Sequence, residues 1–385
     1  MVDSTKLSGE NPALLRRINR SAVLRALDPE TPQTMAELVT RVGLSRRTVE
    51  DSLAELLAEG WASVAAAAAG DASTRSAEVV ERRAAGRPAR RFRFRAEAGR
   101  VAGIDLGAAR IECLVTDLSG TILDEAAIEA DPGWPAERRL SVARELLTGT
   151  LASGTAPLLS LGVGTTGIVD AGRIMLSTAL PDWTGFDVAG ALRAAVDCPV
   201  LVENDGNVAA IAERWLGAAT DVPDVLLIHA GRRITAGVVI DGRLHLGRHR
   251  RAGEVGTMPM LHWERILTDL AAMAQPHTTG GRRPPRPVFA EVARDLAVGV
   301  AAMALTLDPD VVVLGGQLSA LGAGFRREFE AALATHCPWE LEVRNSTLGG
   351  RGVSLGAVRL ALDEVESRLY AVDGADRTAG VLAAR

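Results

Sequence analysis

A short basic and hydroxyl-bearing stretch, residues 45–48, carries the first chemistry that the sequence offers. It follows a glycine-containing corner and stands where a helix is expected to begin. Guanidinium groups bind DNA phosphates and the edge of guanine, and hydroxyl groups bind phosphates. Two carboxylates follow at once, so the basic patch is narrow. The residues predicted here to contact double-stranded DNA are Ser45, Arg46, Arg47 and Thr48.

Three short helices are expected to position this patch. Apolar residues recur at helical spacing after Ser21, Thr34 and Ser45, which are the expected N-caps. Gly43 supplies the turn before the third helix and Gly60 ends that helix. This pattern is typical of a helix-turn-helix, which lays its last helix in the major groove. A plain three-helix bundle that packs on the rest of the protein is the alternative.

A second basic stretch, Arg87–Arg95, is expected to lie beside the helices. Pro88 disfavours helix in the residue before it, and arginines then alternate with Phe92 and Phe94 as in a strand. Such an extended basic segment can lie along a DNA groove as a wing or an arm. Arg87 and Arg90 are therefore predicted to contact DNA. The alternative is a solvated linker between domains.

Charge is distributed unevenly along the 385 residues. The net charge is −5, but the first 100 residues carry a balance of +4 and the remainder −9. A basic head on an acidic body predicts that only the head meets a polyanion, although chance asymmetry also explains so small a difference. Hydrophobic residues make up 47% and charged residues 24%, which excludes a mainly disordered chain.

Targeting and redox signals point to the cytoplasm. No apolar run approaches the roughly 18 residues that span a bilayer, and no basic stretch leads into an apolar segment at the N-terminus. Cys113, Cys198 and Cys337 lie far apart, which suits a reducing compartment and offers neither a disulfide framework nor a Cys-x-x-Cys metal clip. We therefore expect a soluble cytoplasmic protein without membrane contact.

From Val101 onwards, strands and helices are expected to alternate. Residues 103–123 and 225–244 share one plan: a strand, a glycine-containing turn, a second strand and a tight turn. Helical segments follow each copy. The repetition predicts a duplicated α/β domain with a cleft between its lobes, where a small ligand is expected.

Further motifs stand along the chain in a recognisable order. They are Asn19–Leu24, Gly86–Ala89, Gly162–Asp170, Leu201–Ala210, Gly253–Gly256 and Val311–Ser319. In order and spacing they resemble the ROK family, which comprises repressors, open reading frames and sugar kinases on the actin-like ATPase fold. The first two resemble the repressor branch, which carries an N-terminal DNA reader that the kinase branch lacks. The resemblance extends from about Asn19 to Gly356.

The resemblance implies a fold class and a domain organisation. The fold is α/β, with an N-terminal winged helix-turn-helix joined to a two-lobed, actin-like, sugar kinase-like domain. Residues 1–98 are expected to form the DNA-binding domain with its wing and linker. Residues 99–385 are expected to form the effector domain.

The resemblance also implies a ligand site. Asp205 matches the family's general base and Glu254 matches a glutamate that hydrogen-bonds the sugar; no catalysis is predicted here. A carboxylate beside the Asn204 amide suits hydroxyl groups, because one accepts hydrogen bonds and the other donates and accepts. Thr166 and Gly167 are expected to roof the site. The alternatives are a turn role for Asn204 and Asp205 and a solvated loop for Glu254.

Both phosphate-binding loops depart from the family's kinases. The first, Asp105–Arg110, has Ala109 where the family has threonine. The second, Gly231–Gly237, has Arg233 and Thr235 at two glycine places. Glycine lets backbone N–H groups approach phosphates, so the ATP site is predicted to be disabled. The adjacent arginines of the second loop can hold an anion, such as a phosphorylated sugar, or point into solvent.

The family's zinc segment is also missing. Thr257 replaces its histidine, and no cysteine lies between Cys198 and Cys337. We therefore predict no bound metal and no cofactor. The same loss, together with Ala179 in place of an asparagine, removes part of the family's usual sugar contacts.

These observations predict a transcriptional regulator. It would be a repressor of carbohydrate-metabolism genes that binds operator DNA as a homodimer or tetramer and responds to a sugar or sugar derivative. One alternative is an active ATP-dependent sugar kinase. The other is a regulator that has lost sugar sensing and responds to another ligand or a protein partner. No role is assigned to the loop Gln275–Pro287.

Overall fold

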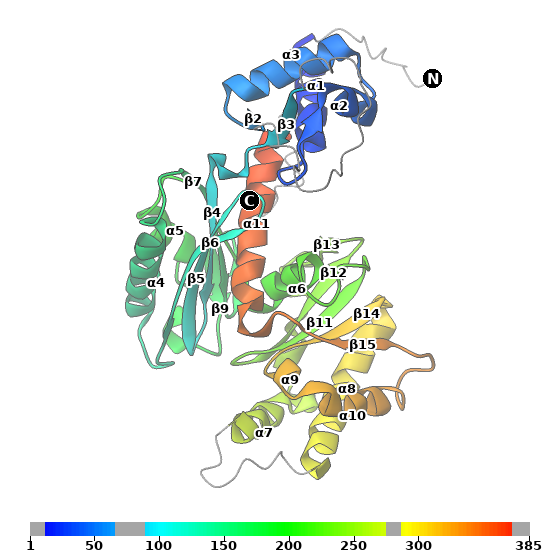
Figure 1. Ribbon diagram of the computed structural model, residues 1–385. Coiled ribbons are helices and arrows are strands. Elements are labelled where there is room, and N and C mark those ends of the chain that lie inside the picture. The colour runs from blue at the N-terminus through cyan, green and yellow to red at the C-terminus, as the bar shows by residue number, and fades with distance from the viewer. Residues whose placement is uncertain (1–11, 66–88, 275–285, 372–385) are drawn as a thin grey trace, which may run out of the picture. The chain divides into compact units, whose positions relative to one another are not determined.

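The computed structural model describes residues 12–65, 89–274 and 286–371 (Figure 1). Contacts divide them into two units. The first unit contains the described residues up to Gly99, which we call the head, together with Asp117–Ser119 and residues 364–371. The second unit contains Arg100–Thr116 and Gly120–Asp363. The division into a DNA-binding domain at residues 1–98 and an effector domain at residues 99–385 stays a prediction.

Local sequence signals set the helices of the head. They are α1 (Pro12–Ala26), α2 (Met35–Val42) and α3 (Arg46–Ala58). At the start of α2, Thr34 Oγ1 accepts the Glu37 N–H at 3.3 Å and Glu37 Oε2 accepts the Thr34 N–H at 2.6 Å. Gly43 ends α2 with a φ of 70°, a conformation that glycine adopts without strain. The predicted bounds of α2 are confirmed.

The first helix begins earlier than predicted. Its first residue is Pro12, and Ser21 lies within it as a buried side chain. The Ser21 hydroxyl donates to the Tyr370 carbonyl oxygen at 3.2 Å. The prediction that Ser21 is an N-cap is therefore wrong, because α1 begins nine residues before it and residue 21 is not at a helix start.

A small sheet completes the head. Strands β1 (Gln33–Thr34), β3 (Arg91–Phe94) and β2 (Ala62–Val64) are antiparallel and lie in that order. Phe92 and Phe94 are buried, whereas Arg91 and Arg93 alternate with them toward solvent. The strand predicted from this alternation is confirmed. Three helices followed by such a hairpin form a winged helix-turn-helix.

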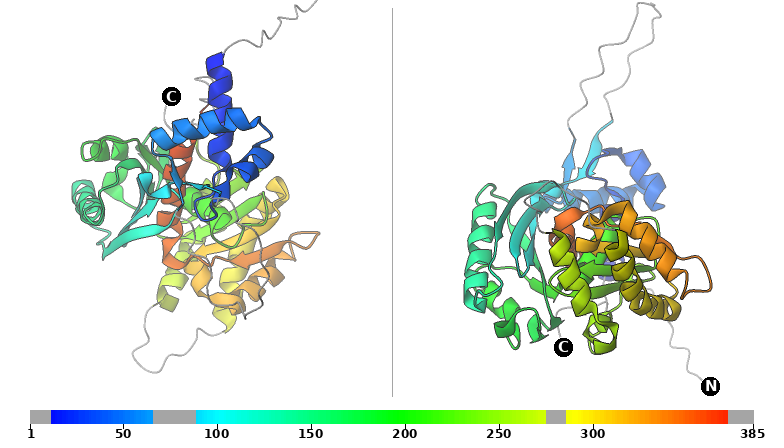
Figure 2. Two further views of the ribbon diagram at one scale, coloured as in Figure 1. Left: turned by 45° about the horizontal axis from the view of Figure 1, so that its top comes forward. Right: turned by 90° about the horizontal axis from the view of Figure 1, so that it is seen from below.

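A five-stranded sheet forms the first lobe of the second unit, within the described ranges. Its order is β10-β7-β4-β5-β6, with β10, β7 and β4 parallel. The bounds are β4 (Arg100–Leu106), β5 (Arg110–Asp117), β6 (Ile122–Glu129), β7 (Leu158–Thr165) and β10 (Val200–Asn204). Helices α4 (Ala136–Leu151) and α5 (Val188–Arg193) pack on one face (Figures 1 and 2). A hairpin of β8 (Ile168–Asp170) and β9 (Arg173–Leu176) follows β7.

Helix α11 (Gly352–Leu369) lies directly on the other face of this sheet. A Cβ at Gly162 would stand 1.9 Å from the Ala357 carbonyl oxygen, and one at Gly103 would stand 2.4 Å from the Ser354 carbonyl oxygen. Only glycine permits so close an approach of helix and strand.

A second five-stranded sheet, also within the described ranges, forms the second lobe. Its order is β13-β12-β11-β14-β15. The strands are β11 (Val225–Ala230), β12 (Ile234–Ile240), β13 (Arg243–Leu244), β14 (Val311–Gly316) and β15 (Glu342–Asn345). The helices of this lobe are α6 (Asp205–Trp215), α7 (Trp263–Ala274), α8 (Arg286–Leu307), α9 (Gln317–Ala320) and α10 (Gly322–Leu333). Side chains of α8 and α10 bury one face and side chains of α6 the other. Each sheet begins with the strand–turn–strand plan predicted from the sequence.

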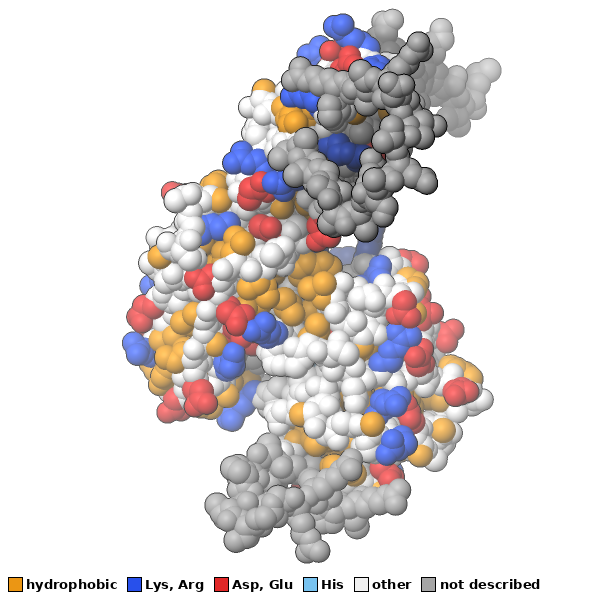
Figure 3. Space-filling view, viewed as in Figure 1, with side chains coloured by type: hydrophobic (Ala, Val, Ile, Leu, Met, Phe, Trp, Pro, Cys, Tyr) orange, Lys and Arg blue, Asp and Glu red, His pale blue; other side chains and the backbone are white. Residues whose placement is uncertain are grey.

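The surface of the second unit mixes both signs of charge. On the face drawn in Figure 3, the described basic and acidic side chains are interspersed. This face offers no continuous basic field of the kind that binds polyanions. None of the described helices combines the length and the apolar character that crossing a membrane requires.

Candidate functional site

The first turn of α3 presents the predicted DNA-contacting side chains. The Ser45 hydroxyl accepts the Thr48 N–H at 3.2 Å and shares a 2.8 Å hydrogen bond with the Thr48 hydroxyl. Ser45 is thus the N-cap of α3. The Arg46 and Arg47 side chains are 73% and 84% exposed. The helix start therefore carries two accessible guanidinium groups, whose contact with DNA stays a prediction.

Each of these guanidinium groups pairs with a carboxylate one turn further along. Arg46 Nε lies 2.8 Å from Glu50 Oε1, and Arg47 Nε lies 3.1 Å from Asp51 Oδ2. Exposed helical pairs of this kind are worth about 0.3–0.5 kcal/mol. Both arginines can therefore exchange these carboxylates for DNA phosphates at little cost.

Of the two arginines predicted from the wing, Arg90 is described. It is exposed, and its guanidinium carbon lies 5.7 Å from the centre of the Phe92 ring. This cation–π contact holds the guanidinium group beside the start of β3. Arg87 lies outside the described residues.

In the second unit, Asn204 joins two of the predicted ligand-binding segments. Its Oδ1 accepts the N–H groups of Gly206 at 2.8 Å and Asn207 at 3.2 Å, which makes it the N-cap of α6. Its Nδ2 donates to the Gly167 carbonyl oxygen at 3.0 Å. The side chain therefore fastens the Gly167 turn to the start of α6. Thr166, next to this turn, is buried.

Asp205 and Glu254 lie close enough to influence each other. Burial raises the pKa of Asp205 to about 6, although the Gly206 N–H bonds its Oδ1 at 2.8 Å and opposes the shift. Burial also raises the pKa of Glu254 to about 6, with a smaller contribution from the charge of Asp205. The structure thus brings Asn204, Asp205, Gly167 and Glu254 to one region. Their contact with a ligand, like that of Thr166, stays a prediction.

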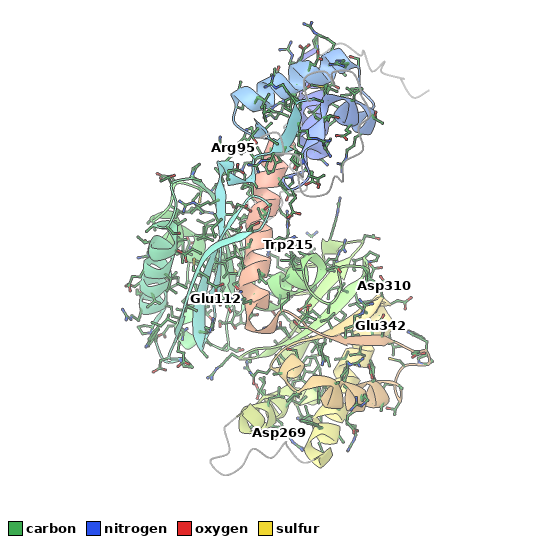
Figure 4. All side chains as sticks on the ribbon, viewed as in Figure 1. Arg95, Glu112, Trp215, Asp269, Asp310 and Glu342 are labelled. Carbon is green, nitrogen blue, oxygen red and sulfur yellow. The ribbon has the colours of Figure 1, made fainter. Side chains whose placement is uncertain are left out.

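The first phosphate-loop region adds a further carboxyl group. Burial first, and then the charges of Asp205 and Glu112, raise the pKa of Asp105 well above its usual range. Glu112, labelled in Figure 4, accepts from Arg110 Nη2 at 2.6 Å and from the Ser354 hydroxyl at 2.5 Å. The guanidinium group of Arg110, the one basic residue of this loop, is therefore bonded to a carboxylate of β5.

Arg139 on α4 supports the same loop, and sequence reasoning missed it. The residue is fully buried, and its guanidinium group donates to the carbonyl oxygens of Gly107 at 2.7 Å, Ala108 at 3.0 Å and Asp131 at 2.6 Å. Nothing in the local sequence distinguishes it from the exposed arginine before it.

The second loop is occupied by side chains. Arg233 donates to Thr178 Oγ1 at 3.0 Å and to Glu264 Oε1 at 2.8 Å, so it neither points freely into solvent nor stands open to an anion. Thr235 Oγ1 would stand 2.0 Å from a Cβ at Gly206. The Thr235 hydroxyl therefore packs closely against the first turn of α6. Arg232 is exposed.

A buried ion pair between Arg250 and Glu203 lies next to Asn204. Arg250 pairs with Glu203, whose side chain is 1% exposed, and donates to the Val169 carbonyl oxygen at 2.7 Å. Glu203 Oε1 accepts the Asn204 N–H at 2.8 Å and Asn207 Nδ2 at 2.9 Å. Arg250 adopts a φ of 56°, which side chains rarely accept. Sequence reasoning missed this pair.

The sequence and the structure of this chain are similar to those of known proteins. The model described as "ROK family" matches residues 101–277. A xylose repressor of Caldicellulosiruptor bescii is 22% identical over 93% of this chain and 98% of its own length. Residues 101–277 of this chain thus form a ROK family domain. A crystal structure of a ROK family transcriptional regulator, a homologue of the E. coli MLC protein, covers 96% of this chain and 98% of its own, with a TM-score of 0.67 and 19% identity.

A ROK kinase matches a smaller part of the chain. The ROK hexokinase of Thermus thermophilus covers 69% of this chain and 99% of its own, with a TM-score of 0.57 and 27% identity. The hexokinase thus matches about two thirds of this chain, whereas the regulator matches nearly all of it. The two-lobed ROK fold and the N-terminal helical region predicted from the sequence are confirmed.

Thr257 and the residues after it stand at the place of the ROK zinc segment. The described residues contain no group of three or more His, Cys, Asp or Glu side chains arranged to hold a metal ion. Thr257, at the histidine position, bonds its hydroxyl to the Glu254 carbonyl oxygen at 2.7 Å. Its side chain thus closes the short helix Glu254–Thr257.

Proposed function

We propose that this ROK protein is a sugar-responsive transcriptional repressor of carbohydrate-metabolism genes. The carrying observation is the winged helix-turn-helix head, whose recognition helix exposes Arg46 and Arg47 at a capped N-terminus. The match to a xylose repressor over 93% of the chain supports this proposal, because it extends beyond the part that a ROK hexokinase covers. DNA is bound through phosphate contacts and base edges at the start of α3.

The repressor acts as an even-numbered oligomer. One helix-turn-helix reads only a few base pairs, so two heads on a palindromic operator are needed for useful specificity. A homodimer, or a tetramer built from dimers, supplies them.

The effector is a sugar or sugar derivative held at Asp205 and Glu254. A ligand changes operator affinity only as far as it prefers one arrangement of the protein over another. Phosphoryl transfer does not follow, since Arg110 is bonded to Glu112 and the second loop carries Arg233 and Thr235. The sugar kinase is the second candidate, because the raised pKa of Asp205 suits a general base.

Selection of binding sites from genomic fragments, followed by gel-shift titration with and without a sugar panel, tests this proposal. We expect a palindromic operator, affinity that falls steeply with salt, and a change in affinity with one sugar class. Absence of specific DNA binding would overturn the repressor. ATP-dependent sugar phosphorylation that Asp205→Asn abolishes would establish the kinase. An operator whose affinity no sugar changes would leave a regulator of another ligand.

A further inference from the structure

His229 is a half-buried side chain beside Asp205 that none of the sequence motifs explains. It stands near the end of β11, opposite Thr235 on β12 and Gly315 on β14. Directly opposed residues point to the same face of a sheet. His229 and Thr235 therefore share one face. It is the face that also carries Leu227, which packs with α6.

The imidazole and the carboxylate lie near each other beside Gly231. A Cβ at Gly231 would stand 3.4 Å from His229 Nε2 and 3.9 Å from Asp205 Oδ2, so these two atoms are at most about 7.3 Å apart. Because residue 231 is glycine, it places no side chain beside them. A ligand that carries several hydroxyl groups can therefore reach both groups at once.

The imidazole has hydrogen-bonding capacity that the protein does not use. Among the described residues, neither ring nitrogen of His229 has a hydrogen-bond or ion-pair partner. The neighbouring Thr235 Oγ1 is buried and also lacks a partner within the described ranges. Burial lowers the pKa of His229 to about 4, so the ring is neutral at pH 7 and offers one donor and one acceptor.

Asp205 lies close to two further carboxyl groups. The charge of Asp205 acts on both Asp105 and Glu254. A phosphate or carboxylate group bound beside Asp205 would add a further negative charge to them at low dielectric, which is costly. Hydroxyl groups carry no such cost, since each can donate to a carboxylate and accept from an imidazole.

We propose that His229 binds the effector directly, and that the effector is an uncharged polyhydroxylated molecule whose hydroxyl groups bridge the His229 imidazole and the Asp205 carboxylate. This inference rests on the proposed function and assigns the ligand class of the same site. It adds a specificity residue that the ROK motifs do not include.

Calorimetry on the full-length protein tests it with a panel of neutral mono- and disaccharides and polyols, their phosphate esters, and amino sugars. The parent is expected to bind a neutral member most tightly. His229→Ala should weaken that binding about tenfold, the effect of losing one hydrogen bond from a confined site. His229→Gln keeps a donor and an acceptor near the Nε2 position and should stay within about threefold of the parent. His336→Ala, which truncates an exposed histidine three residues after α10, is the matched control and should bind as the parent does.

A spectroscopic readout separates contact from a folding effect. The chain has six histidines. In imidazole ¹⁵N spectra, saturating neutral sugar should shift the resonance that His229→Gln removes and leave the His336 resonance in place. Equal sugar affinity of the parent and His229→Ala would overturn the role of His229. Tightest binding of a phosphate ester or an amino sugar would overturn the ligand class, and so would no binding of neutral sugars. None of these results touches operator binding, so failure of this inference is distinguishable from failure of the repressor.

Discussion

Removing Arg250 is expected to destabilise the second unit strongly, and by an amount that depends on the replacement. The guanidinium group is the cationic partner of Glu203, whose side chain is 1% exposed, and also bonds the Val169 carbonyl oxygen at 2.7 Å. Both partners lie in the first lobe, whereas Arg250 follows β13 of the second. The substitution therefore leaves a buried carboxylate without its counter-charge.

The magnitude follows from burial and backbone conformation. Removing one partner of a buried ion pair costs about 3–5 kcal/mol. Arg250→Ala carries this full cost, since alanine is also strained at the φ of 56°. Arg250→Gly relieves about 1 kcal/mol of backbone strain, so it should cost about 2–4 kcal/mol. Arg173→Ala breaks an exposed pair with Asp187 and should cost less than about 1 kcal/mol.

Urea unfolding followed by tryptophan fluorescence measures these differences. Burial already raises the pKa of Glu203 above 4.5, and loss of Arg250 raises it further. A carboxyl group with a raised folded-state pKa loses stabilisation as the pH rises from its unfolded pKa toward its folded pKa. The deficit of both Arg250 variants should therefore grow between pH 5 and pH 7. An Arg250→Ala protein within 1 kcal/mol of the parent at pH 7, or a deficit that does not grow, would refute the reasoning.

Three further outcomes are expected. The double variant Arg46→Ala/Arg47→Ala should bind operator more weakly with an unchanged melting temperature, and the slope of log K against log salt should fall by about 2 in gel-shift titrations; an unchanged slope would contradict phosphate contact by these arginines. Asp205→Asn should lose the effector response, yet its free energy of unfolding at pH 7 should be up to about 3 kcal/mol higher than that of the parent. The reason is that the pKa of Asp205 is raised to about 6, so its ionisation opposes folding above pH 4. A less stable variant would contradict this. Gly162→Ala should destabilise the protein by more than about 3 kcal/mol in urea, since a Cβ there would stand 1.9 Å from the Ala357 carbonyl oxygen; a neutral effect would show that α11 can move away.

Features that depend on neighbours in the chain were predictable from the sequence. The Thr34–Glu37 capping box, the Ser45 N-cap and the alternation of Phe92 and Phe94 each involve residues at most a turn apart. Their physical causes, orphan N–H groups at a helix start and the two-residue period of a strand, act locally. The same holds for the motifs that indicated the ROK fold, because each is a short continuous stretch of sequence.

Tertiary structure alone decided which polar side chains far apart in the sequence became partners. Ser21 was expected to cap a helix, but its hydroxyl bonds a carbonyl oxygen 349 positions away. Arg250 and Glu203 are 47 positions apart, and Arg139 bonds loop carbonyl oxygens 31 and 32 positions earlier. His229 reads as one residue of a buried strand until folding sets Asp205 beside it. A buried polar group must be satisfied by whatever the fold brings within hydrogen-bond distance, and a one-dimensional pattern does not contain that distance.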